Sequence, residues 1–143
     1  MNVLLIVATL LQPPQDPSIV LELGKLKGTW SVVSPNIDGK DKTQGFADVR
    51  YVFNGQLLTL TDKNGKAFRQ KNDGKVEERK FKLNVDANPK AIDLTISEKF
   101  QSLGVYSLNG DTLMLCTAEP GLPRPTDFKG KVGVSLVVLK REK

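Results

Sequence analysis

The chain offers few residues for catalysis, because its 143 positions include no histidine and a single cysteine, Cys116. A Ser-His-Asp triad, a Cys-His pair and a histidine zinc site are therefore excluded. One cysteine also excludes an intramolecular disulfide and a multi-cysteine metal cluster. Carboxylates, lysines and tyrosines remain. We expect no enzymatic activity, no cofactor and no metal site, with a carboxylate-based enzyme as the least favoured alternative.

Two acidic pairs test that alternative. Glu77 and Glu78 are adjacent in a predicted strand, so they point to opposite faces and do not act jointly. Asp38 and Asp41 lie in a loop that lacks a full calcium ligand set. Cys116 has no neighbouring base in the sequence, and we expect it to be a small, semi-buried apolar residue.

Arg124 is the most unusual polar residue, because prolines on both sides hold it in extended geometry. One interpretation is a rigid lip, residues 119–128, that presents Arg124 to an anionic group. The favoured interpretation is structural. Arg124 would pair with a carboxylate such as Asp93 or Asp127, while Phe128 plugs the barrel that the strand pattern predicts.

The positive charge is concentrated in one segment. Residues 63–82, the basic hairpin, carry a net charge of +5, which equals the net charge of the whole chain. A solvated hairpin is the favoured interpretation, and an electrostatic docking patch is the alternative. Phe68 and Phe81 are its only aromatic residues, so we expect no nucleic-acid partner.

The N-terminal segment differs from the rest. Residues 3–11 are apolar except for Thr9, and the prolines of residues 12–17 follow. The apolar run is too short to span a bilayer but matches the core of a signal peptide. We assign residues 1–17 to a possible signal peptide or leader with a linker, and residues 18–143 to one domain. Export to the envelope or medium is favoured, and a cytoplasmic location is the alternative.

The domain must hold its side chains on strands, because little of it has helical periodicity. A short amphipathic helical turn is predicted over residues 18–27. Alternating apolar residues separated by turns such as Asn54-Gly55 then predict eight strands. Such a series favours an all-β, eight-stranded antiparallel up-and-down barrel, with a two-sheet sandwich as the alternative. The predicted strands cover residues 29–34, 46–53, 56–61, 75–85, 91–96, 101–108, 112–117 and 131–141.

Several motifs in this series carry a family resemblance. Gly28 and Trp30 form a Gly-x-Trp at the first strand, and residues 89–95, 104–106, 110–113, 115–116, 124–128 and 138–141 follow in order. The chain resembles a lipocalin-like (calycin-type) domain family of unknown function that is abundant in planctomycete bacteria. The resemblance covers about residues 25–142 and departs from the pattern over 63–74, where the chain is longer. It implies a barrel end closed by Gly28, Trp30 and a basic residue, Lys140 or preferably Arg141.

The resemblance and the strand pattern together lead to two expected functions. A barrel of this size holds its own side chains or one small ligand. We expect either a monomeric domain that binds a small apolar or amphipathic ligand, or a filled barrel that contacts a protein partner through residues 63–82 or 119–128. The candidate interior residues are Trp30, Tyr51, Phe53, Leu58, Leu60, Phe81, Leu83, Ile92, Leu94, Tyr106, Leu113, Leu115, Leu136 and Val138.

Overall fold

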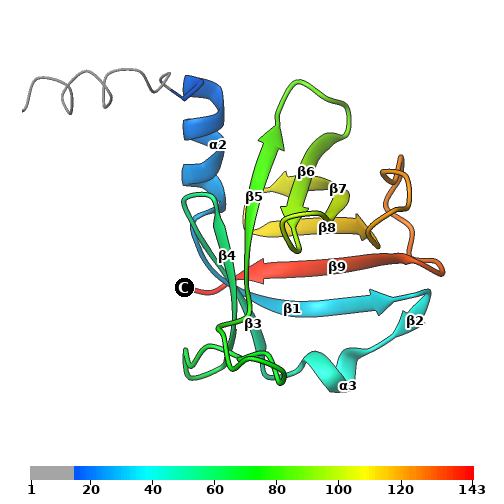
Figure 1. Cartoon of the computed structure of the whole chain (residues 1–143). Coiled ribbons are helices and arrows are strands. Elements are labelled where there is room, and N and C mark those ends of the chain that lie inside the picture. The colour runs from blue at the N-terminus through cyan, green and yellow to red at the C-terminus, as the bar shows by residue number, and fades with distance from the viewer. Residues whose placement is uncertain (1–14) are drawn as a thin grey trace, which may run out of the picture.

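The computed structural model describes residues 15–143, and helix α2 (Pro17–Leu26) opens this part of the chain (Figure 1). Asp16 caps the helix by accepting a hydrogen bond from the Ser18 amide at 2.9 Å. Pro17 occupies the first turn, where its missing N–H is not needed. The predicted helical turn is therefore confirmed as a helix. The expected leader falls mostly on residues 1–14, which lie outside the described residues.

Eight antiparallel strands follow and close into a barrel, because β1 pairs with both β3 and β9. Each of the other strands pairs with its neighbours in sequence, so every pairing but the closing one joins consecutive barrel strands. The predicted all-β antiparallel barrel is confirmed, and the sandwich alternative is excluded. The strands are β1 (Gly28–Ile37), β3 (Val49–Asn54), β4 (Leu57–Asp62), β5 (Glu78–Asn84), β6 (Lys90–Thr95), β7 (Gln101–Asn109), β8 (Thr112–Ala118) and β9 (Val134–Arg141).

Two small elements between β1 and β3 were not predicted. Strand β2 (Lys40–Asp41) pairs with the end of β1, and helix α3 (Thr43–Phe46) follows it. Asp41 accepts hydrogen bonds from the amide and the hydroxyl of Thr43, which start the helical turn. The prediction that a strand begins at residue 46 is therefore wrong, since Phe46 ends α3 and β3 begins at Val49.

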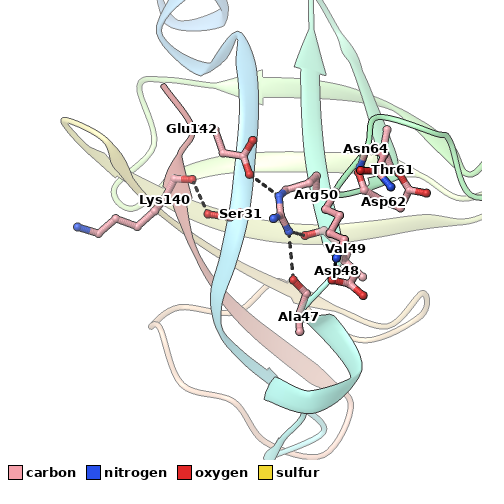
Figure 2. Close-up of polar contacts among 11 residues, drawn as sticks. Ser31, Ala47, Asp48, Val49, Arg50, Thr61, Asp62, Asn64, Lys140 and Glu142 are labelled. Atoms are coloured by element: carbon pink, nitrogen blue, oxygen red, sulfur yellow. Dashed lines mark hydrogen bonds and ion pairs between the residues drawn. The ribbon is translucent and has the colours of Figure 1, made fainter.

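The closing seam is reinforced on the outer face of the barrel (Figure 2). Arg50 of β3 reaches across β1 and pairs with Glu142, which follows β9. The Ser31 hydroxyl of β1 donates to the Lys140 carbonyl of β9 at 3.3 Å. Three strands are thus joined by side chains in addition to their backbone ladders.

The main core lies inside the barrel and beneath α2, which covers the end where β1 begins. We call this the closed end, and the opposite end the open end. Leu23 and Leu26 of α2 join the barrel residues in this core. Phe53 and Phe81 meet edge to face there, with ring centroids 5.7 Å apart. Twelve of the fourteen candidate interior residues belong to this core, pack against it or line a cavity at the open end.

The prediction that Leu136 and Val138 face the interior is wrong. Val137 and Leu139 belong to the main core, so alternation turns their neighbours outward. Leu136 packs instead with a second cluster on the outer face, around Cys116. The loop between β8 and β9 covers that cluster, which is why β9 is apolar on both faces.

Among residues 15–143, no helix has both the length and the apolar character needed to cross a membrane.

Candidate functional site

The closed end is built around Trp30, which is fully buried. Its indole Nε1 donates a hydrogen bond to the Leu26 carbonyl at 2.9 Å, so the ring anchors the end of α2 to β1. The Arg141 guanidinium lies 4.3 Å from the centroid of the indole ring. This is the geometry of a cation–π contact.

Arg141 also ties the helix to the last strand. Its Nη1 donates to the Lys27 carbonyl at 2.8 Å, and its Nη2 donates to the Lys25 carbonyl. Its Nε pairs with Asp111 at 3.1 Å. Gly28 has a φ of +132°, and a Cβ there would lie 3.4 Å from Nη1. The structure therefore brings Gly28, Trp30 and Arg141 together, as the resemblance implied, with Arg141 rather than Lys140 on the indole.

Sequence reasoning missed a buried carboxylate beside this plug. Glu22 of α2 accepts hydrogen bonds from the Tyr106 hydroxyl at 2.7 Å and from the Lys90 ammonium at 2.8 Å. Burial alone would raise the pKa of Glu22, but these two donors outweigh it and the pKa is lowered. The sequence did contain a sign of this arrangement, because Glu22 shares its helix face with Ile19, Leu23 and Leu26.

The same contact keeps Tyr106 protonated. Burial and the Glu22 carboxylate together raise the pKa of the Tyr106 phenol far above its ordinary value. With Trp30 and Arg141, this network fixes α2 over the closed end. Its polar groups pair with one another, with Asp111 or with nearby backbone carbonyls, so the network closes this end of the barrel and we call it the plug.

The open end holds a cavity of about 180 Å³. Strands β1, β3 to β6, β8 and β9 contribute to its wall. Most of the wall is apolar, and five of the candidate interior residues, Tyr51, Leu58, Leu60, Leu94 and Leu115, line it. The remaining lining residues are Ile37, Glu77, Arg79, Thr117, Ser135 and Val137.

Two kinds of polar group face this cavity. Arg79 and Glu77 form an ion pair at 2.5 Å, and each side chain is about a quarter exposed, at 24% and 25%. The uncharged polar groups are the hydroxyls of Tyr51, Thr117 and Ser135. Burial raises the pKa of Tyr51 to about 12, so its phenol stays protonated at neutral pH.

The other candidate interior residues fill the barrel between the cavity and the plug. Phe53, Phe81, Ile92 and Leu113 are each at most 2% exposed. Leu83 is buried with them, while Trp30 and Tyr106 form the closed end. The interior is therefore filled over most of its length and hollow at one end.

The expected pairing of Arg124 with Asp93 is confirmed. Its Nη1 lies 2.7 Å from Asp93 Oδ1 and donates to the Gly104 carbonyl at 2.9 Å. These contacts pin the lip to the outer face of β6 and β7. The expectation that Phe128 plugs the barrel is wrong, because Phe128 packs against the outer cluster around Cys116.

The basic hairpin folds back onto the end of β4. The Phe68 amide donates to the Leu60 carbonyl, and the Leu60 amide donates to the Glu77 carbonyl, both at 3.0 Å. The Glu77 amide in turn donates to the Phe68 carbonyl at 2.6 Å. This three-way ladder fixes Glu77 at the rim of the cavity, two residues before Arg79.

Comparison with known proteins agrees with this architecture. A family model described as a lipocalin-like domain matches residues 26–115, which is more than half of the chain. Among curated proteins and among solved structures, no match is found. The match begins at the last residue of α2 and ends within β8, so it includes Trp30 and most of the cavity wall but not Glu22 or Arg141. The chain belongs to the lipocalin-like domain family.

Proposed function

We propose that this domain binds one small apolar or amphipathic ligand in the cavity at the open end, without transforming it. The observation that carries the proposal is the cavity itself. The barrel is packed from the plug to Phe53 and Phe81, yet about 180 Å³ beyond them is left unfilled. The cavity opens to solvent, where Glu77 and Arg79 are each about a quarter exposed, so a ligand can enter it and cover apolar wall that water now contacts.

The volume restricts the ligand to about one ring. Sites for drug-sized ligands span roughly 300–1,000 Å³, whereas an apolar cavity of about 150 Å³ accommodates benzene. The cavity here, at about 180 Å³, is close to the smaller figure. A ring-sized molecule fits inside this volume, whereas a long acyl chain would extend out of it.

A pair of variants on β4 tests the proposal. Leu60 lines the cavity, whereas Leu57, three residues earlier on the same strand, does not. Leu60→Phe adds volume inside the cavity, and Leu57→Phe adds the same volume outside it. We expect ring-sized probes such as toluene or benzyl alcohol to shift the NMR signals of cavity residues in the wild type and in Leu57→Phe, but not in Leu60→Phe.

Native mass spectrometry of protein purified from its own host identifies the natural ligand. A co-purifying small molecule that is lost in Leu60→Phe supports the proposal. Wild-type protein that binds none of the ring-sized probes and yields only the mass of the bare chain refutes it.

Other expectations from the sequence stay predictions. They include export, the planctomycete-type branch of the family and a protein partner for residues 63–82 or 119–128. Apolar side chains do stand out from the open-end loops, with Phe68 39% and Val132 85% exposed. Charge reversal at Lys66, Arg69 and Lys71 tests the partner hypothesis, because it would weaken capture at low salt.

A further inference from the structure

We infer that the cavity selects a neutral ring-sized molecule bearing one hydrogen-bonding group, such as an aryl alcohol, over the corresponding carboxylate. This inference rests on the proposed function and adds the chemical class of the ligand. It follows from which polar groups of the wall are already paired and which are not.

The charged groups of the wall are already paired with each other. Arg79 and Glu77 are its two charged side chains, and they form an ion pair at 2.5 Å. A carboxylate ligand would have to displace Glu77 from the guanidinium or lie beside a second negative charge. Either course is unfavourable, because a carboxylate that leaves water needs a free cation or several donors.

The neutral groups of the wall are available. No hydrogen bond within the described residues uses the hydroxyl of Tyr51, Thr117 or Ser135, whereas other hydroxyls, such as those of Ser31, Ser102 and Tyr106, are bonded. Thr117 and Ser135 are register partners on β8 and β9, so their side chains lie next to each other on the wall. A hydroxyl both donates and accepts, so these three groups recognise a ligand hydroxyl or carbonyl.

The apolar part of the wall accounts for the ring. Leu58, Leu94 and Leu115 are buried members of the main core that also line the cavity. Tyr51 adds an aromatic body whose phenol stays protonated, since its pKa is raised to about 12. A ring against the leucines with a short polar arm toward the hydroxyls uses both kinds of surface.

Three probes with the same ring test this inference. Toluene, benzyl alcohol and benzoate differ in one substituent, which is apolar, neutral and polar, or charged. We expect NMR titration of the wild type at neutral pH to give the tightest binding for benzyl alcohol, and at least tenfold weaker binding for benzoate. Tyr51→Phe is expected to weaken benzyl alcohol about fivefold and to leave toluene unchanged, because one hydrogen bond is lost.

A charge variant tests the role of the ion pair. Glu77→Gln frees Arg79, and we expect it to strengthen benzoate binding at least tenfold. Glu78→Gln is the matched control, because Glu78 is adjacent, exposed and absent from the cavity wall. It removes the same charge and is expected to leave all three affinities unchanged. Thr117→Val gives a second hydroxyl deletion should Tyr51→Phe unfold.

The outcomes separate this inference from the proposed function. Benzoate binding at least as tightly as benzyl alcohol in the wild type overturns the inference, and so does equal binding of toluene and benzyl alcohol. In both cases the cavity still binds a ring, and the proposed function stands. Failure of all three probes to bind refutes the proposed function, and the inference with it.

Discussion

Replacing Arg141 by methionine should remove the closure of the barrel's closed end while keeping most of the apolar stem of the side chain. The guanidinium makes three kinds of contact. It lies 4.3 Å over the Trp30 ring, it donates to the carbonyls of Lys25 and Lys27 at the end of α2, and it pairs with Asp111. Methionine makes none of them.

The expected cost follows from these contacts. A hydrogen bond from a charged donor is worth about 1.5–3 kcal/mol, but the two carbonyls lie near the surface and water replaces part of the loss, so we assign about 1 kcal/mol each. The cation–π contact adds about 1 kcal/mol. The pair with Asp111, whose side chain is half-exposed, adds at most about 0.5 kcal/mol. Since neighbouring contacts do not add fully, we expect Arg141→Met to lower the free energy of unfolding by about 2–3 kcal/mol.

Urea denaturation followed by far-UV circular dichroism measures this change. Fluorescence is less suitable, because the single tryptophan itself senses the guanidinium. Lys140→Met is the matched control, since Lys140 is the neighbouring residue on β9, is exposed and carries the same charge. We expect the control to change the free energy of unfolding by less than about 0.5 kcal/mol. A loss below about 1 kcal/mol in Arg141→Met, or equal losses in both variants, would refute the reasoning.

Three further predictions follow from other buried groups. Because the pKa of Glu22 is lowered in the fold, the stability it contributes is present above the ordinary carboxyl pKa and is lost as the pH falls through the folded value. The free energy of unfolding of Glu22→Gln should therefore fall below that of the wild type at neutral pH, and this gap should narrow as the pH falls below the ordinary carboxyl pKa; a gap that widens in acid contradicts this. Gly104→Ala should lower the free energy of unfolding by about 2–3 kcal/mol, because the new Cβ would lie 2.8 Å from Thr117 Cγ2, whereas Gly45→Ala meets nothing within 4 Å and should be neutral by the same urea assay. Cys116 is buried and its pKa is raised by burial, so a thiol reagent should modify the native protein at least about 100-fold more slowly than the urea-unfolded chain; comparable rates would show that the thiol is accessible.

The strands that face water on one side were predictable from their alternation. Phe81 and Leu83 of β5 alternate with lysines, and both are buried. The two-residue turns were equally clear, since Gly55 and Gly110 adopt the positive φ that such turns require. For strand β9, the residues that face the interior could not be identified in this way. Val134 to Leu139 is apolar on both faces because one face lines the barrel and the other lies under a loop, so alternation carries no information there.

The cavity and the contacts of Glu22 were harder to predict than the fold. Tyr51, Leu60 and Leu115 were correctly placed toward the interior, but whether an interior is full or hollow depends on how side-chain volumes meet across strands. Glu22 was missed for a related reason. Its partners are Lys90 on β6 and Tyr106 on β7. Both lie far from Glu22 in the sequence, and only the closed barrel brings them to α2.

The basic hairpin takes on a different meaning once its position is known. In the sequence it was a concentration of charge, and the family resemblance led us to expect a longer segment there, over residues 63–74. In the structure its base carries both charged residues of the cavity wall, Glu77 and Arg79, and its hydrogen bonds to β4 hold Glu77 at the rim. Where the segment meets the cavity, the positive charge of Arg79 is thus balanced by Glu77. Both charged residues of the wall therefore come from this one segment, and substitutions at Glu77 and Arg79 change the charge of the cavity while its apolar wall, on other strands, stays the same.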